Sequence, residues 1–236
     1  MKALAALLLA GKLGKVLTSG GTMLLSVFAY AFVFGWWYAV GFVALLLIHE
    51  MGHFLAARKR GLNVGLPTFI PFVGAWIQLK EQPMDAETEA FVGIAGPMLG
   101  SAAAFVCYML ARETGSGLLM ALAYAGFFLN LFNLIPLSPL DGGRIVSVIS
   151  PKIWFLGVPI LVGLFFWIPS PLLVLIAILA LPQMWSVLTN RQALDSRYYQ
   201  TARAVRVEYA VQYLALAGFL AIMAFEAHEA AGRAAP

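Results

Sequence analysis

The stretch VLTSGGTMLLSVFAYAFVFGWWYAVGFVALLLI, from Val16 to Ile48, contains no Asp, Glu, Lys, Arg or His. It is too long for one membrane helix, which needs about 20 residues to cross a bilayer. Gly35 interrupts it and is followed by a Trp-Trp-Tyr group, whose aromatic rings favour the membrane interface. We therefore predict a helical hairpin, with one helix near Thr18–Phe34 and a second near Trp36–Ala57.

The composition of the whole chain agrees with a membrane location. The chain has 236 residues, of which 62% are hydrophobic and 11% are charged, and its mean hydropathy is +0.88. Soluble chains carry about 25% charged residues, so this composition excludes a soluble domain. The single cysteine, Cys107, excludes an internal disulfide and a cysteine-based metal site.

Five further spans are predicted after the hairpin. They lie near Ala90–Ala111, Gly117–Leu134, Ile153–Trp167, Pro171–Leu188 and Tyr209–Phe225. The fold class is thus an all-α polytopic membrane protein, a bundle of about six to seven transmembrane helices. The length fits one compact bundle and leaves no room for a large extra domain.

The segment between Arg58 and Glu89 has a different pattern. It is rich in Gly, Pro and β-forming residues and then turns acidic. It is too short to span as a helix, and it predicts one or two short strands at the membrane edge. We expect a short membrane-associated β segment between the second and third helices.

Basic residues mark the ends of the spans. Net charge is +4, and the basic residues gather at four places: Lys2, Lys12 and Lys15; Arg58, Lys59 and Arg60; Arg144 and Lys152; and Arg191, Arg197, Arg203 and Arg206. All four groups lie on one side of the membrane if the N-terminus is cytoplasmic, as the positive-inside rule favours. The charge therefore indicates topology and not nucleic-acid binding.

The motif HEMGH, from His49 to His53, places ionisable groups near the end of the second predicted helix. Residues four apart on a helix differ by about 40° around the axis and ~6 Å along it, so both imidazoles face one side. Two nitrogens about 2 Å from one zinc ion can therefore come from one helix turn. Glu50 stands beside the first histidine and can take a proton from an attacking water.

A solvated helix end is the alternative interpretation of this motif. Arg58 marks the expected interface, and His49 lies about 14 Å deeper at 1.5 Å per residue. A charge at that depth costs at least about 2.5–3.5 kcal/mol on insertion scales. Three ionisable groups within five residues therefore indicate a polar cavity or a bound cation.

The stretch NLFNLIPLSPLDGGRI, from Asn130 to Ile145, supplies a candidate third ligand. A catalytic zinc usually has three protein ligands and one open position. Asp141 follows two prolines, which prevent a regular helix, and precedes Gly142 and Gly143, which let the backbone turn tightly. A cytoplasmic turn with a solvated aspartate is the alternative.

Together the two stretches resemble the site-2 protease family of intramembrane zinc metalloproteases. That family joins HExxH on one membrane helix to an N-x-x-P-x-x-x-L-D-G segment on a later one, matched here by Asn133, Pro136, Leu140, Asp141 and Gly142. The resemblance implies that His49, His53 and Asp141 ligate one Zn²⁺ per chain. It implies that Glu50 is the catalytic base. It also suggests that Asn133 binds the substrate backbone or the developing oxyanion.

A small-residue stretch, GIAGPMLGS from Gly93 to Ser101, resembles the helix that lies between the two metal segments in this family. Gly96 and Gly100 are the matching positions, and a general packing face is their favoured role. Many relatives carry a PDZ domain between the second and third spans, or CBS domains after the last. The corresponding segments here are short, so we expect a minimal form.

Three other protein classes compete with this interpretation. Another membrane metalloprotease family takes a downstream glutamate as third ligand, and Glu87 or Glu89 could serve there, although neither has the expected helical context. The motifs of intramembrane serine and aspartyl proteases are absent from this sequence. A zinc-binding transporter or a non-proteolytic membrane chaperone would have no need for Glu50 beside a ligand.

We therefore predict an intramembrane zinc endopeptidase that cleaves in or near the transmembrane segment of another protein. One integral membrane domain is expected over residues 1–236, with a metal-site core at about 16–151 and C-terminal helices at about 153–226. The expected partners are a transmembrane protein substrate and the lipid bilayer, with no nucleic acid. We expect a multi-pass protein of the bacterial cell membrane with a cytoplasmic N-terminus. The segment 64–80 could offer an edge strand to the substrate.

Overall fold

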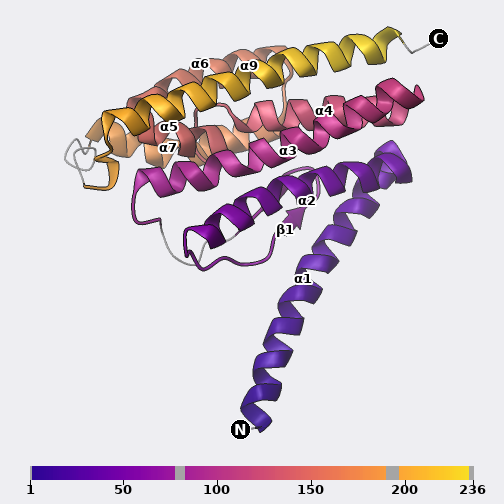
Figure 1. Cartoon of the computed structure of the whole chain (residues 1–236), viewed down its shortest axis with the longest axis horizontal. Coiled ribbons are helices and arrows are strands. Elements are labelled where there is room, and N and C mark those ends of the chain that lie inside the picture. The colour runs from indigo at the N-terminus through magenta and orange to yellow at the C-terminus, as the bar shows by residue number, and fades with distance from the viewer. Residues whose placement is uncertain (1, 78–82, 190–196, 234–236) are drawn as a thin grey trace.

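A computed structural model describes residues 2–77, 83–189 and 197–233, without the side chains of residues 2–13, 15 and 233 (Figure 1). The described elements are α1 (Lys2–Phe34), α2 (Trp36–Lys59), β1 (Thr68–Ile70), β2 (Gly74–Trp76), α3 (Ala86–Thr114), α4 (Gly117–Asn133), α5 (Asp141–Ile149), the 3₁₀ helix η1 (Pro151–Leu156), α6 (Gly157–Trp167), α7 (Pro171–Thr189), the 3₁₀ helix η2 (Arg197–Tyr199) and α9 (Arg203–Arg233).

The membrane helices match the prediction of a polytopic all-α protein. Among the described residues, five helices are long and apolar enough to cross a bilayer, and two shorter apolar helices cover Gly117–Asn133 and Pro151–Trp167. The predicted break at Gly35 is confirmed: α1 ends at Phe34, and Gly35 has a positive φ of 84°. The helix α1 begins at Lys2, well before the expected Thr18, and no proline separates the two.

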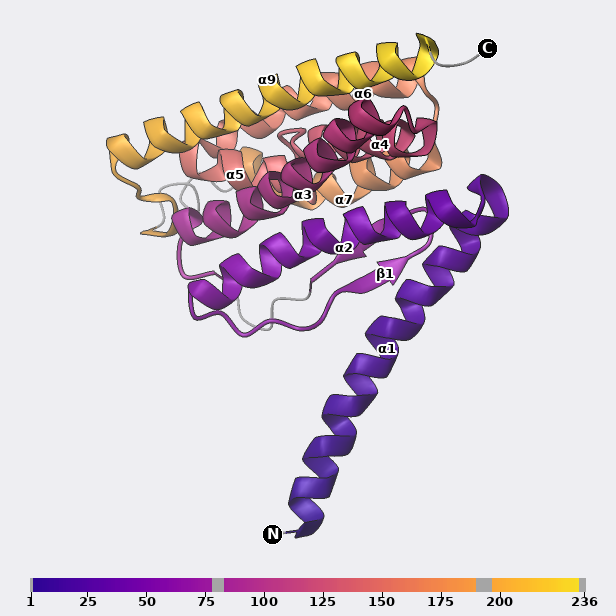
Figure 2. The ribbon, with the colours of Figure 1, turned by 45° about the vertical axis from the view of Figure 1, so that its right-hand side comes forward.

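The helices α2, α3, α4 and α9 form the body of the molecule, and each packs on the next. The helix α3 packs between α2 and α4, and α9 covers α4 and α5. Figures 1 and 2 show α2, α3, α4 and α9 running side by side, while the N-terminal part of α1 projects away from the bundle. The short helix α5 also packs on α3, so the segment after α4 returns to the middle of the bundle.

The β segment predicted between the second and third spans is an antiparallel hairpin. Phe69 of β1 is paired with Ala75 of β2. The hairpin is attached to α1 by three hydrogen bonds: Ser19 Oγ donates to the Pro67 carbonyl, the Phe69 amide donates to Thr22 Oγ1, and the Phe72 amide donates to Tyr30 Oη. These contacts satisfy non-helical backbone groups, as membrane depth requires.

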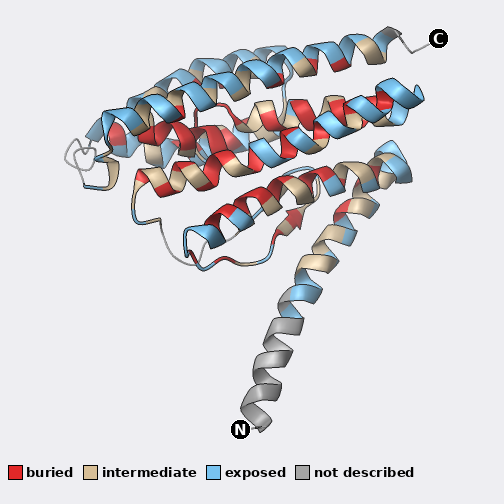
Figure 3. Cartoon of the chain, viewed as in Figure 1, coloured by how far each residue is buried: buried red, intermediate tan, exposed pale blue. Residues whose placement is uncertain are grey.

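Polarity in this bundle is reversed relative to a soluble protein. Figure 3 shows exposed residues along α9 and on the described part of α1. These two helices and α7 carry many large apolar side chains that are exposed. Among the residues whose side chains are described, nine polar or charged ones are instead buried: Ser26, His49, Glu50, His53, Thr88, Ser101, Asn130, Asp141 and Ser147. Burying ionisable groups is costly unless each has a partner, so their contacts indicate where the chemistry lies.

Candidate metal centre

The helix α2 carries His49, Glu50 and His53 deep in the bundle, where they are 3%, 5% and 6% exposed. This end of α2 packs closely on α3. A Cβ at Gly96 of α3 would lie 2.2 Å from His53 Nε2. The small-residue stretch of α3 is therefore a packing face, as expected. Its Gly96 makes room for the ring of His53.

The helix α5 supplies Asp141 as its first residue, and this differs from the irregular turn that the two prolines and two glycines predicted. Gly142 and Gly143 lie inside the helix. A Cβ at Gly142 would be 2.2 Å from the Leu134 carbonyl oxygen, and one at Gly143 would be 2.4 Å from the Ser138 nitrogen. The glycines are thus needed for close backbone approach between α5 and the preceding loop, and not for a turn.

Three side-chain atoms from these two helices converge on one point. His49 Nε2 and His53 Nε2 are 3.1 Å apart, and each lies 3.2 Å from Asp141 Oδ2. Two donors that each lie ~2.1 Å from a tetrahedral zinc ion are separated by roughly 3.3–3.4 Å. The three atoms therefore have the spacing of one face of such a tetrahedron, and no other group of this kind occurs among the described residues.

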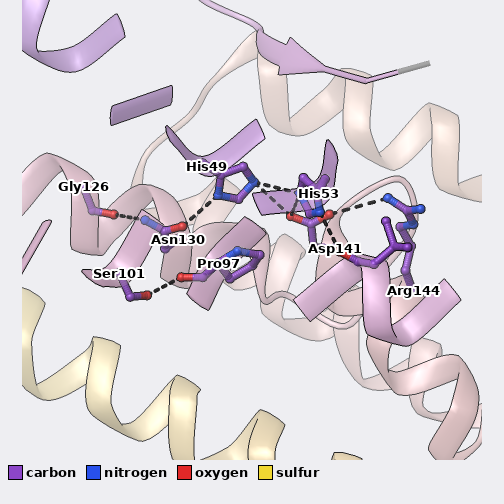
Figure 4. A network of polar contacts seen from close by, with 9 residues as sticks. His49, His53, Pro97, Ser101, Gly126, Asn130, Asp141 and Arg144 are labelled. Atoms are coloured by element: carbon purple, nitrogen blue, oxygen red, sulfur yellow. Dashed lines mark hydrogen bonds and ion pairs between the residues drawn. The ribbon is translucent and has the colours of Figure 1, made fainter. Parts of the chain in front are cut away.

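The opposite ring nitrogens show which tautomer each histidine adopts (Figure 4). His53 Nδ1 lies 2.7 Å from the Val92 carbonyl oxygen, which can only accept, so Nδ1 carries the proton. His49 Nδ1 lies 2.8 Å from Asn130 Oδ1. The amide of Asn130 is oriented by its own nitrogen, which donates to the Gly126 carbonyl at 2.7 Å, so its oxygen must face His49.

Both Nε2 atoms consequently present lone pairs when the rings are neutral. Two nitrogen lone pairs and a carboxylate oxygen then meet within 3.2 Å, with no proton between them. Such an arrangement is repulsive by itself and is stabilised by a cation at its centre. Hydrogen bonds from the second nitrogens are also the usual means by which metal-binding histidines are oriented. The residues present therefore fit a metal ion.

Asn130 is the residue of this site that the sequence did not reveal. It is almost completely buried, and a Cβ at Gly100 of α3 would lie 2.4 Å from its Oδ1. The glycine at position 100 makes room for this amide. The sequence carries only weak signals for this role of Asn130: an asparagine inside an apolar helix and a glycine, Gly100, on the helix before it.

A cavity of about 420 Å³ opens beside the three converging atoms. Glu50 and Asn133 line it, together with residues 73–77 of the hairpin and apolar side chains of α7. The Glu50 carboxylate has no hydrogen-bond partner among the described residues, so it is available to a molecule in the cavity. The candidate base and the candidate substrate-binding amide thus face the same space.

The alternative third ligands lie elsewhere. Glu87 pairs with Arg60, with 3.4 Å between Oε1 and Nη2, and Glu89 accepts a hydrogen bond from Tyr198 Oη at 2.5 Å. Asp141, in contrast, contacts both histidines. The geometry therefore favours the ligand set of the site-2 proteases over that of the glutamate-ligand family.

Comparison with known families agrees with this geometry. Residues 37–117, which carry His49, Glu50 and His53, match the profile described as peptidase family M50. The segment belongs to peptidase family M50. This is the site-2 protease family, so the resemblance to that family is confirmed, with the match covering the first of the two motifs. The matched M50 segment ends before Asp141, which the structure places beside both histidines.

Curated relatives of the M50 segment are named as zinc metalloproteases. The zinc metalloprotease MJ0392 of Methanocaldococcus jannaschii is 32% identical over 123 residues, which is 49% of this chain and 35% of that protein. Two provisionally named zinc metalloproteases are also similar. Rip3 of Mycobacterium tuberculosis is 35% identical over 46% of this chain and 29% of its own length, and MJ0611 of M. jannaschii is 28% identical over 58% and 87%. The chain spans about a third or less of the length of the first relatives that it matches.

Proposed function

We propose that this chain is an intramembrane zinc endopeptidase that hydrolyses a peptide bond in or near the transmembrane segment of another protein. The observation that carries the proposal is the convergence of three lone-pair donors within 3.2 Å, beside a cavity that Glu50 lines. His49, His53 and Asp141 would hold the zinc ion. The family and the names of the relatives support the choice of metal.

The bound zinc ion would act as a Lewis acid toward the scissile carbonyl and lower the pKa of the attacking water. Glu50 takes the proton of that water and delivers it to the leaving amine, because its carboxylate faces the cavity without a competing partner. The Asn133 amide, in the same cavity, offers a hydrogen bond to the substrate backbone or to the developing oxyanion. The surrounding apolar side chains exclude bulk water from the reacting groups.

The hairpin gives the substrate a place to become extended. A peptide bond within a helix is shielded by its own hydrogen bonds, so the target helix must unwind locally. The strand β2 pairs with β1 along one edge, and residues 73–77 line the cavity. We propose that the substrate adds as a strand beside β2, which would align its backbone with Glu50 and Asn133.

The topology is proposed from charge. Basic groups at the ends of α2 and α7 and near the start of α9 lie on the same side as the N-terminus under the positive-inside rule, which favours a cytoplasmic N-terminus. A bacterial cell membrane is the proposed location. The partners in this proposal are a transmembrane protein substrate and the lipid bilayer, with no nucleic acid.

The deciding experiment compares the wild type with Glu50→Gln. We expect purified wild type to cleave a membrane-spanning reporter and the variant to be inactive, while both contain equal zinc, because Gln cannot accept the proton of the water. Zinc in both proteins without cleavage in either would favour a transporter or a chaperone. Absence of zinc from both would refute the ligand set.

The role of β2 is tested with proline. Ala75→Pro removes an amide from β2, so cleavage should fall at least about tenfold while zinc content stays unchanged, because the edge loses a donor to the substrate. Val73→Pro is a less specific variant, since the Val73 amide already donates to the Ile70 carbonyl inside the hairpin. Undiminished cleavage by Ala75→Pro would exclude strand addition.

A further inference from the structure

A row of polar contacts leads from the metal centre to the segment before α9. Asp141 directs Oδ2 toward both histidines, and its other oxygen, Oδ1, lies 3.9 Å from Arg144 Nη1 (Figure 4). Arg144 Nε lies 3.7 Å from Glu89 Oε1 on α3. Glu89 Oε2 accepts a hydrogen bond of 2.5 Å from Tyr198 Oη of η2.

One guanidinium therefore lies between two carboxylates of different helices. Its side chain is 23% exposed, and the two carboxylate side chains are 10% and 26% exposed, so all three charges are partly removed from water. The planar fork of arginine can direct separate N–H groups at two carboxylates, which a lysine ammonium on a flexible stem does less well. Gly93 of α3 permits this arrangement, since a Cβ there would lie 3.2 Å from the Cβ of Arg144.

The far end of the row is anchored to α9. Arg206 donates to the carbonyl oxygens of Thr201 and Tyr199, each at 3.2 Å, and so holds the segment 197–202 against the start of α9. Burial and the neighbouring Glu89 charge raise the pKa of Tyr198 above its usual value. The hydroxyl therefore keeps its proton and remains a donor to Glu89.

We propose that Tyr198, Glu89 and Arg144 form a positioning chain, through which the segment before α9 holds Asp141 as a single-oxygen ligand. The inference rests on the proposed metal site. With Oδ1 facing the Arg144 guanidinium at 3.9 Å, only Oδ2 is directed at the metal position, and the space needed by water and substrate stays open. Displacement of residues 197–199 from α3 would release Glu89, then Arg144, and would let the second oxygen of Asp141 turn toward the metal.

Two variants and one matched control test the chain. Tyr198→Phe removes only the hydroxyl and Glu89→Gln removes the charge that holds Arg144. Tyr199→Phe, the control, removes the hydroxyl of the neighbouring tyrosine. The ring centroids of Tyr198 and Tyr199 are 4.9 Å apart, but among the described residues the Tyr199 hydroxyl makes no hydrogen bond. The readouts are zinc affinity, measured by competition with a chromophoric chelator, and the visible spectrum of the cobalt-substituted protein, whose intensity falls when the metal gains a fifth ligand.

We expect Glu89→Gln to weaken zinc binding roughly 10-fold or more, the range found when groups that orient metal ligands are removed. Tyr198→Phe should weaken zinc binding severalfold. Both variants should lower the intensity of the cobalt spectrum. The double variant should lose little more than Glu89→Gln alone, because both residues act through Arg144. Tyr199→Phe should match the wild type in both measurements.

Unchanged zinc affinity and cobalt spectrum in folded Tyr198→Phe and Glu89→Gln would overturn the positioning chain. If Glu89→Gln does not fold, Tyr198→Phe against Tyr199→Phe decides alone. A wild-type protein that binds no zinc would instead overturn the proposed function, and the inference with it.

Discussion

Each of the two histidines reaches the metal position with the same nitrogen because its other nitrogen has an acceptor. For His53 the acceptor is a backbone carbonyl, which no side-chain substitution removes. For His49 it is the amide oxygen of Asn130. The second orientation therefore depends on one side chain, and this makes Asn130 the most sensitive position outside the ligands.

Asn130→Ala should weaken zinc binding roughly 10- to 100-fold, because His49 loses the acceptor that fixes its tautomer and ring position. Chelator competition on the purified protein measures this change. The control is Asn133→Ala, three residues further along α4, which lines the cavity without a described bond to a ligand. It should bind zinc normally and cleave poorly. Equal zinc affinity in both variants would contradict the assignment of the two asparagines.

The site also depends on how closely the helix α5 approaches the end of α4. The α4–α5 loop folds back so that the first turn of α5 lies against it, and two further bonds hold this arrangement. Trp154 of η1 donates from Nε1 to the Gly143 carbonyl at 2.7 Å, and Tyr213 of α9 donates to the Leu134 carbonyl at 2.6 Å. Asp141 is therefore placed by contacts that lie outside its own helix.

Gly142→Ala should lower the free energy of unfolding by about 1–3 kcal/mol, the usual cost of overpacking a tight interior. The added Cβ would meet the carbonyl oxygens of Leu134 and Ile135, and backbone atoms cannot turn aside. Zinc content should fall with stability, since Asp141 is adjacent. Thermal unfolding in detergent measures the first effect. Gly163→Ala in α6, whose Cβ would meet nothing within 4 Å, is the control and should leave stability unchanged or slightly raised, because alanine favours a helix over glycine.

The helix α9 closes the bundle over α4 and α5. Its buried face includes Leu220, Ala224 and Ala227, which join the same hydrophobic cluster as Phe127 of α4 and Ile145 of α5. Lipid tails are as apolar as leucine, so this face gains little from leaving lipid. What stabilises the contact is close packing, and packing depends on shape.

Leu220→Ala should therefore destabilise the protein by about 1–2 kcal/mol, less than the cost in a water-soluble core, because the cavity term remains while the transfer term is lost. Leu214→Ala, on the same helix, is the matched control. Leu220 is fully buried, whereas Leu214 is 67% exposed. Thermal unfolding in one detergent compares them. Equal loss of stability in the two variants would show that close packing of its buried face does not hold α9 on the bundle.

Features that depend on residues close together in the chain could be predicted before the structure. A charge-free run too long for one helix, broken at Gly35, predicts the α1–α2 hairpin, and the Gly- and Pro-rich segment before α3 predicts the strands. The spacing of His49 and His53 places both rings on one helix face without any knowledge of the rest. Family resemblance then joined this motif to Asp141, far along the chain.

The way these segments meet depends on contacts between distant parts of the folded chain. The helical start of α5, the packing role of Gly142, the support of His49 by Asn130 and the row from Arg144 to Tyr198 all join segments far apart in the chain. Such contacts depend on the rotation and closeness of whole helices, and no local periodicity records them. Some of these contacts use backbone carbonyl oxygens as hydrogen-bond acceptors, such as those of Val92 and Leu134. Every residue type carries this carbonyl, so the residue type at such a position gives no signal of the contact.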